Sequence, residues 1–444
     1  MWEYYEGKVI LITGGSGFLG TTLVYRILQK APCSHIFLLY RRNLSNLREV
    51  WNQWLPEEIV LKMLDPKRVT ILDGDITKPE CGLLVSNINM LRDKVNIVVH
   101  CASSINLVHP LGRISQNIIG ATEWLANFAL QLTNLERFVY VSTAYTNTHL
   151  FHATPEGDVR VKEQIYQLSA TPNVQLEWSE VQKKGSSVEY QSNNFPWAYA
   201  YAKQLTERLL YDIFSCTGSS HKLLILRPSI IGPAQKYPYP GFSFPLSTPM
   251  TIFTAATALW PTLWARISTR YERPETEATN DEVPVDVVVD RLLTHLAFGT
   301  TGPVHAVSGG HARRKLHDVW TEVCQFRRWP WVPRVEWLAD DWHSDKQHFV
   351  VRQYVILGTS FLFSDDKTTT LRDNSIDRDL QGLELFTLSE RPSPDSSLKK
   401  HQIWHCMERI GRRNLMARWM TVLLYRSYRL KDLKRDIVRR CTCS

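Results

Sequence analysis

The feature that most constrains the fold is a short apolar run that meets a cluster of glycines near the N-terminus. Val9–Thr13 reads Val-Ile-Leu-Ile-Thr, a β-branched run typical of a strand buried on both faces. Gly14, Gly17 and Gly20 follow with the spacing G-x-x-G-x-x-G, and a helix is expected over Leu19–Lys30. A buried strand, a glycine turn and a helix in this order predict the first βα unit of a parallel sheet.

Further short apolar runs alternate with helical patterns along the chain. The expected strands cover residues 36–40, 68–72, 96–100, 137–141 and 223–227, and helices are expected over 113–132 and 199–214. This alternation predicts an α/β fold with a Rossmann-type doubly wound parallel sheet. After about residue 310 the alternation stops, which indicates a smaller mixed or helical substrate and C-terminal region. The expected domains are a Rossmann domain over 1–235, completed by about 280–310, an insertion over 236–280, a C-terminal domain over 311–400 and a basic helical tail over 401–444.

Each glycine of the turn has a physical role if the turn holds a dinucleotide. Gly14 lets the chain turn off the strand, Gly17 lets the backbone approach a pyrophosphate, and Gly20 lets the helix pack closely on the sheet. The phosphates then lie at a helix N-terminus, which favours anions. The alternative is a glycine-rich turn without a ligand. The candidate cofactor-binding residues here are Thr13, Gly14, Ser16, Gly17, Phe18, Leu19 and Gly20.

The residues after the second and third strands indicate which dinucleotide is bound. An acid after the second strand would bind a ribose 2′-hydroxyl, but Arg41 and Arg42 stand there. Two guanidinium groups suit a 2′-phosphate and therefore favour NADPH, unless they belong to a solvated loop. Asp75 and Ile76 follow the third strand, where either an adenine contact or a capping Asp is expected.

Tyr199 and Lys203 form a Y-x-x-x-K pair, whose spacing places both on one helix face. A nearby ammonium is expected to lower the pKa of the phenol and so make it useful for proton transfer near pH 7. Thr143 follows the fifth strand, at the edge where ligands bind open α/β sheets, so its hydroxyl is placed to hydrogen-bond a substrate carbonyl beside Tyr199. Ser142 is expected to be structural.

Charge and cysteine usage exclude several classes of protein. The 444 residues carry a net charge of +8, and residues 408–444, with eleven basic and three acidic side chains, account for all of it. The remaining neutral body argues against a nucleic-acid-binding face. The eight cysteines contain no C-x-x-C pair, so neither a zinc framework nor a disulfide scaffold is expected, and no metal is expected in the site.

An ordered set of longer motifs carries a family resemblance. These are ILITGGSGFLG at 10–20, GDIT at 74–77, VVHCASSI at 98–105, FVYVSTAY at 138–145, KEQIY at 162–166, WAYAYAKQLTERLL at 197–210, LRPSIIGP at 226–233, PYPGF at 238–242, VPVDVVVD at 283–290, VHAVSGG at 304–310 and a late piece at 361–388. The chain resembles the fatty acyl-CoA reductases, which are male-sterility-type members of the extended short-chain dehydrogenase/reductases.

The resemblance implies NADPH-dependent reduction of a fatty acyl-CoA, or of another acyl thioester, to the aldehyde and on to the primary alcohol. It places Tyr199 and Lys203 at the catalytic pair and Thr143 at their hydroxyl partner. It also places Asn117 on a helix near the cofactor, His100 at a structural position or beside the cofactor, and the backbone of Pro228 and Ile230 near the nicotinamide. Two alternatives stay open: an extended dehydrogenase or epimerase acting on a sugar nucleotide or sterol, and a non-catalytic NADPH-binding scaffold docked on a membrane.

The sequence also suggests where the protein acts. The N-terminus has no apolar signal region, so the cytoplasmic side is expected. Residues 237–265 lack charge but contain five prolines, which favours a substrate-facing loop and a short helix over a membrane span. The tail 408–444 resembles a basic amphipathic helix and predicts peripheral contact with an anionic intracellular membrane, unless it packs on the body. Prenylation of Cys441 is a further, less favoured reading of the C-terminal residues.

Overall fold

A computed structural model describes residues 1–41, 44–154, 157–170, 172–259, 264–324, 334–348, 350–375, 377–389, 396–412, 417, 419 and 420. The chain divides into two compact units, and each is discontinuous in sequence. Unit 1 comprises Met1–Phe242, Asp281–Arg313 and Phe361–Pro392, and unit 2 comprises Ser243–Asn280, Arg314–Ser360 and Ser393–Ser444. The segment 311–400, expected as a single domain, therefore contributes to both units, and the first seven residues of the expected insertion 236–280 belong to unit 1.

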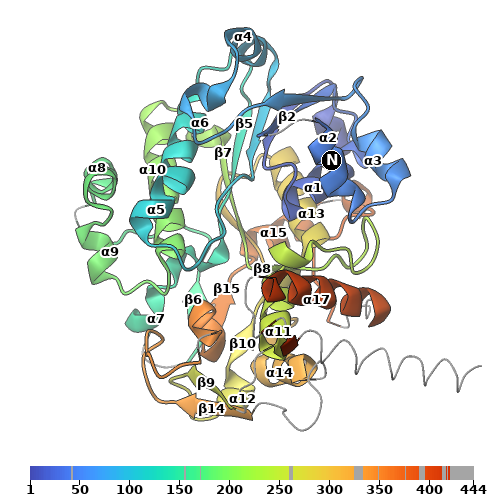
Figure 1. Ribbon diagram of the computed structural model, residues 1–444. Coiled ribbons are helices and arrows are strands. Elements are labelled where there is room, and N and C mark those ends of the chain that lie inside the picture. The colour runs from blue at the N-terminus through green and yellow to red at the C-terminus, as the bar shows by residue number, and fades with distance from the viewer. Residues whose placement is uncertain are drawn as a thin grey trace, which may run out of the picture. The chain divides into compact units, whose positions relative to one another are not determined.

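Unit 1 is built on a seven-stranded parallel sheet with the strand order β12-β7-β5-β4-β1-β2-β3 (Figure 1). Its strands are β1 Val9–Thr13, β2 His35–Tyr40, β3 Val69–Asp73, β4 Ile97–His100, β5 Arg137–Val141, β7 Leu223–Pro228 and β12 Gly302–Ala306. The six strands expected from the sequence are confirmed to within a residue at each end. Because the order reverses between β1 and β4, the carboxyl ends of these two strands flank the topological switch point at which such folds bind ligands.

Helices cover both faces of this sheet, which confirms the expected doubly wound α/β class (Figure 1). The helices of unit 1 are α1 Phe18–Lys30, α2 Leu44–Asn52, α3 Glu57–Met63, α4 Val85–Lys94, α5 Leu111–Ser115, α6 Ala121–Ala129, α7 Leu150–Ala153, α8 Val174–Lys184, α9 Val188–Ser192, α10 Ala198–Cys216, α13 Val285–Ala297, α15 Asp366–Asn374 and α16 Asp377–Leu380. One π-helical turn, η3 Gln116–Gly120, joins α5 to α6. Short pairs β6 Val159–Val161 with β15 Phe361–Phe363, and β8 Ile230–Gly232 with β11 Glu282–Pro284, complete the unit.

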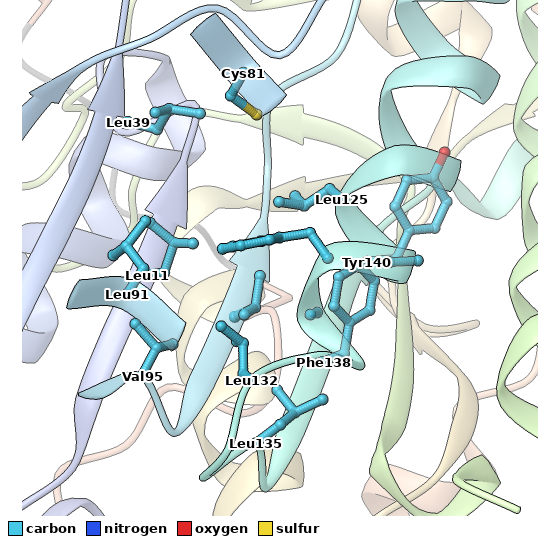
Figure 2. Close-up of a cluster of buried hydrophobic side chains, with 14 of the residues drawn as sticks. Leu11, Leu39, Cys81, Leu91, Val95, Leu125, Leu132, Leu135, Phe138 and Tyr140 are labelled. Carbon is cyan, nitrogen blue, oxygen red and sulfur yellow. The ribbon is translucent and has the colours of Figure 1, made fainter. Parts of the chain in front are cut away.

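One large hydrophobic cluster lies between the sheet and the helices α4, α6 and α10. Figure 2 shows Leu11 and Phe138 from the sheet facing Leu91 of α4 and Leu125 of α6. Each of these side chains is buried, as is Phe214 near the end of α10. The apolar runs seen in the sequence are therefore strands that contribute to this cluster. Strands of a parallel sheet are buried on both faces, which explains why they appear as continuous apolar runs in the sequence.

Unit 2 is smaller and mixed. Its elements are α11 Pro249–Leu259, β9 Trp264–Ser268, α12 Pro274–Glu277, β10 Thr279–Asn280, β13 Arg314–Lys315, α14 Leu316–Cys324, β14 Arg334–Leu338 and α17 Ser396–Gly411. Helices α11 and α17 pack through Ala255, Leu259, Ile403 and Met407. None of the helices in the described part of the chain has the length and apolar character needed to cross a membrane. Of the helical tail expected over 401–444, residues 401–411 lie in α17, and beyond residue 412 only Ala417, Trp419 and Met420 are among the described residues.

Two buried ion pairs fix helix α10, which carries Tyr199 and Lys203. The Arg208 guanidinium donates two hydrogen bonds of 2.6 Å to the Glu177 carboxylate on α8. Glu207 accepts a bond of 3.0 Å from Nε of Arg227 on β7. All four side chains are at most 3% exposed, so each charge depends on its partner for compensation.

The contribution of the buried Glu177–Arg208 pair to stability can be compared with that of an exposed ion pair on α8, the helix that carries Glu177. Glu177→Gln leaves the Arg208 charge buried without a counter-charge, so we expect unfolding to become easier by about 3–5 kcal/mol. Glu180 pairs with Lys184, which is 68% exposed, so Glu180→Gln should cost less than about 1 kcal/mol. Urea denaturation of both variants measures the difference, and equal losses would show that the buried pair is not special.

Candidate active site

The glycine turn is pressed against the chain that leaves β4. Gly14 has a φ of 76°, and a Cβ atom there would lie 2.6 Å from the backbone nitrogen of Ala102. A Cβ atom on Gly20 would lie 2.2 Å from the carbonyl oxygen of Gly14. Real Cβ atoms do not approach backbone this closely, so both positions require glycine. Gly17 caps the start of α1 without a side chain and donates its N–H to the Gly14 carbonyl oxygen at 3.0 Å.

A cavity of about 520 Å³ lies at the switch point of the sheet. Its walls come from the glycine turn, the end of β2, the loop after β3, the loop after β4 and the π-helical turn η3. The lining residues are Gly14, Ser16, Gly17, Leu39, Tyr40, Arg41, Gly74, Ile76, Thr77, Cys101, Ala102, Ser103, Ser104 and Asn117. This volume is within the range of small-molecule sites, and the narrow approach over Gly14 and Gly17 fits a bound pyrophosphate.

The predicted cofactor residues divide into three groups. Gly14, Ser16, Gly17, Arg41 and Ile76 line the cavity. Thr13 ends β1, Phe18, Leu19 and Gly20 begin α1, and Asp75 follows β3, all five outside the cavity lining. Lys203, Pro228 and Ile230 come from α10, β7 and β8, and Arg42 lies outside the described residues.

The sequence reasoning missed the wall formed by residues 101–104. Cys101, Ala102, Ser103 and Ser104 follow directly after β4, and all four line the cavity. The signal was available, because a loop at the carboxyl end of a strand next to β1 must face the same crevice. Asn117 also lines the cavity, from a π-helical turn of the kind that is frequent at functional sites.

Asp75 stabilises its own loop. One of its carboxylate oxygens accepts the Thr77 N–H at 3.0 Å and the Thr77 hydroxyl at 2.8 Å. Partial burial opposes the charge, but these hydrogen bonds hold the pKa of Asp75 below its ordinary value. Asp75 therefore caps its own loop, and its neighbours Ile76 and Thr77 line the cavity.

His100 joins the ends of β1 and β4 as a neutral side chain. The Thr122 hydroxyl donates to the carbonyl oxygen of Ile118 at 2.6 Å, so it accepts from Nε2 of His100 at 3.0 Å. Nδ1 of His100 then accepts from the Thr13 hydroxyl at 2.7 Å, and that oxygen is left to accept the Ala102 N–H at 3.3 Å. Burial lowers the pKa of His100 to about 3, which keeps the ring uncharged. Its contacts are structural.

Tyr199 and Lys203 lie on one face of α10, as the spacing predicts. Nζ of Lys203 lies 6.0 Å from the centroid of the Tyr199 ring and donates a hydrogen bond of 2.8 Å to the carbonyl oxygen of Val141. It also lies 4.6 Å from the centroid of the Tyr140 ring, an aromatic face that attracts a cation. Lys203 is therefore fixed at the carboxyl end of β5.

Thr143 lies where β5 ends, and its hydroxyl makes two long hydrogen bonds. The Thr143 hydroxyl donates to the carbonyl oxygen of Pro228 at 3.3 Å and accepts the Tyr145 N–H at 3.3 Å. Neighbouring Ser142 holds β5 against β7 through its backbone, because its N–H donates to the Leu226 carbonyl oxygen at 2.7 Å. The hydroxyl at the edge of the site is thus that of Thr143.

The expected lowering of the Tyr199 pKa is wrong for this structure. Burial raises the pKa of Tyr199 well above its ordinary value, and burial lowers the pKa of Lys203 to about 7, with Glu207 opposing that change. Both shifts favour the uncharged forms, because Lys203 is buried and Tyr199 is partly buried. Tyr199 is therefore a neutral phenol that holds a proton, which suits a proton donor better than a base.

The pKa of Lys203 predicts a pH-dependent stability. Below pH 7 the Lys203 amine is charged in the folded protein, and burying this charge is a penalty on stability. Between pH 7 and about 10.4 the Lys203 side chain holds its proton in the unfolded chain but loses it in the folded protein, so the penalty shrinks as the pH rises. Lys203→Met removes this penalty, so its melting temperature should exceed that of the wild type most below pH 7. The gap should narrow as the pH rises toward 10. Exposed Lys62→Met is the control, and a gap independent of pH would contradict the shifted pKa.

Comparisons with known proteins agree with this geometry. The male sterility protein family matches residues 12–292. Fatty acyl-CoA reductase 1 of Homo sapiens is 29% identical over 301 residues, which cover 66% of this chain and 55% of that protein. Fatty acyl-CoA reductase 2 of Homo sapiens is 27% identical over 312 residues, which cover 68% of this chain and 56% of that protein. The chain thus spans about half the length of these curated relatives.

Solved structures share the fold. The reductase domain of a nonribosomal peptide synthetase from Mycobacterium tuberculosis has a TM-score of 0.57 at 18% identity and covers 91% of this chain and 92% of that one. The terminal R domain from the myxalamid biosynthetic pathway has a TM-score of 0.56 at 17% identity, with 92% of each chain covered. The family match extends over more than half of the sequence and includes the glycine turn, Thr143, Tyr199 and Lys203. The chain belongs to the male sterility protein family.

Proposed function

We propose that this protein is an NADPH-dependent reductase of fatty acyl thioesters, with acyl-CoA as the substrate. The observation that carries the proposal is the placement of Lys203, whose Nζ lies 6.0 Å from the Tyr199 ring and donates to Val141, two residues before Thr143 at the end of β5. The same sheet holds the dinucleotide-sized cavity at its switch point. The curated relatives, which are named fatty acyl-CoA reductases, supply the substrate class.

The residues of the cavity fit a nicotinamide dinucleotide. Gly14, Ser16 and Gly17 would hold the pyrophosphate, and Arg41 would bind a 2′-phosphate beyond the end of β2. Lys203 is fixed by Val141 where it would bind the hydroxyls of the nicotinamide ribose. When bound, the cofactor supplies the hydride.

The protein residues supply orientation and a proton. Thr143 and Tyr199 would each donate a hydrogen bond to the substrate carbonyl oxygen, and this bond strengthens as negative charge develops on the oxygen. The phenol of Tyr199 is protonated at neutral pH, because its pKa lies above the ordinary value of about 10, and it would give its proton to the oxygen as that oxygen becomes basic. The Lys203 amine, once protonated to the ammonium, would stabilise the phenolate that remains on Tyr199.

The reaction has two parts in the proposed route. In the first, the carbonyl carbon gains a hydride and its bond to sulfur breaks, which releases an aldehyde and a thiolate, and the thiolate takes a proton from water to give the thiol. In the second, the aldehyde carbon gains another hydride and its oxygen takes the Tyr199 proton, which gives the primary alcohol. The route to alcohol consumes two NADPH for each thiol released, whereas release of the aldehyde consumes one.

A second proposal concerns location. Residues 408–444 carry the entire net charge of +8, and we propose that they bind an anionic membrane surface on the cytoplasmic side. Long-chain acyl substrates and products partition into the same surface, so the enzyme would meet them there.

Purified protein with palmitoyl-CoA and NADPH tests the main proposal. We expect thiol release and NADPH loss, and their ratio identifies the aldehyde or the alcohol as product. Tyr199→Phe removes the proton donor and should lower kcat by about 10²–10⁴-fold. Tyr211→Phe, on the exposed side of the same helix, is the control. Absence of both signals across several acyl lengths would refute the reductase function.

Arg41 tests the choice of cofactor. Arg41→Ala should raise the KM for NADPH by about 10–100-fold, since a charge-assisted hydrogen bond contributes about 1.5–3 kcal/mol. The KM for NADH should change little, because NADH has no 2′-phosphate. Arg48→Ala serves as the control, since Arg48 pairs with Glu57 on the surface. An equal effect on both cofactors would show that Arg41 does not bind the 2′-phosphate.

A further inference from the structure

Tyr145 lies two residues beyond Thr143, and its ring packs against Phe361 and Phe363 of β15. We call these two phenylalanines the aromatic clamp. The Tyr145 ring lies 5.8 Å from Phe361 at 84° and 5.2 Å from Phe363 at 88°, so both contacts are edge-to-face. The two phenylalanine rings are parallel at 5.9 Å. They alternate along the strand and therefore share one of its faces. All three side chains are buried.

Strand β15 is held firmly in unit 1. It pairs in parallel with β6, and the Ser364 N–H extends the ladder by donating to the Val161 carbonyl oxygen at 2.9 Å. Nδ1 of His305, on β12, donates to the Ser364 carbonyl oxygen at 2.6 Å. The Glu163 carboxylate accepts the backbone N–H groups of His305 and Lys367, each at 2.8 Å. The clamp is therefore attached to β6 and β12 on both sides.

The backbone of Tyr145 sets the direction of the Thr143 proton. The Tyr145 N–H occupies one lone pair of the Thr143 hydroxyl oxygen at 3.3 Å, so the hydroxyl proton must point elsewhere. It points to the Pro228 carbonyl oxygen at 3.3 Å, a long bond that a substrate oxygen can replace. Burial raises the pKa of the Tyr145 phenol well above the ordinary value, and Asp281 adds to the shift.

We propose that Tyr145 is a positioning residue for Thr143, and that the aromatic clamp of β15 holds it in place. A fixed Tyr145 ring fixes the Tyr145 N–H, and the N–H orients the Thr143 hydroxyl toward the substrate carbonyl oxygen. Residues 361–363, more than 200 positions after Thr143 in the sequence, thereby control kcat. The inference rests on the proposed function, in which Thr143 hydrogen-bonds the substrate.

Kinetics of single and double variants test this coupling. Tyr145→Leu should lower kcat about tenfold and leave the KM for NADPH unchanged, since misplaced catalytic groups cost rate. Tyr145→Phe keeps the ring in the clamp and should restore kcat to within about twofold. Thr143→Val should lower kcat about 100-fold by removing an oxyanion donor. Adding Tyr145→Leu to Thr143→Val should cost nothing further, because Tyr145 acts through Thr143.

A purely structural role for Tyr145 predicts a different result. The losses of the two single variants would then multiply in the double variant, and this outcome would overturn the proposal. Phe214→Leu is the control, because it breaks the buried ring pair of Phe214 with Phe138 without touching the Thr143 turn. It should lower stability and leave kcat unchanged. If kcat falls as far in Phe214→Leu as in Tyr145→Leu, the effect is general and the proposal is wrong.

Deuterium exchange separates this proposal from the proposed function. Phe363→Leu loosens the clamp and should speed amide exchange in peptides covering residues 142–149, with little change in peptides covering α6. This measurement needs no substrate. If the wild type reduces no acyl thioester, the proposed function fails, and the Thr143 role with it. If exchange over 142–149 is unchanged in Phe363→Leu, the clamp fails even where the reductase function holds.

Discussion

The contact on which the site depends is the backbone approach between the glycine turn and the chain after β4. Gly14 leaves no room for a side chain against Ala102, and the Thr13 hydroxyl, oriented by His100, accepts the Ala102 N–H. These contacts join β1 to β4 where the strand order reverses. They also hold residues 101–104, which line the cavity, beside the glycine turn. The shape of the cavity therefore depends on the contact between the carboxyl ends of β1 and β4.

Burial acts on both members of the Tyr199–Lys203 pair, and in opposite directions on their pKa values. It raises the pKa of the phenol and lowers that of the amine, so each group is held near its neutral form. The phenol oxygen of Tyr199 therefore keeps its proton.

The local parts of this architecture could be predicted from the sequence, and the distant ones could not. The strand at Val9–Thr13, the glycine turn and the shared face of Tyr199 and Lys203 depend on neighbouring residues, and all three are confirmed. The raised pKa of Tyr199 depends on burial, which sequence spacing does not report. The pairing of β15 with β6 depends on segments about 200 residues apart, so the C-terminal region looked like a single separate domain.

The discontinuity of unit 1 has a consequence for how the protein is made. Strand β6 leaves the ribosome about 200 residues before its partner β15, which at typical rates of synthesis is a delay of roughly 10–40 seconds. Strands β7 and β12 of the central sheet emerge during that interval, and even after β12 the chain still lacks the strand that packs against the turn after β5. The nascent chain must keep the apolar surface of this turn from wrong partners until the last segment of unit 1, Phe361–Pro392, has been synthesised.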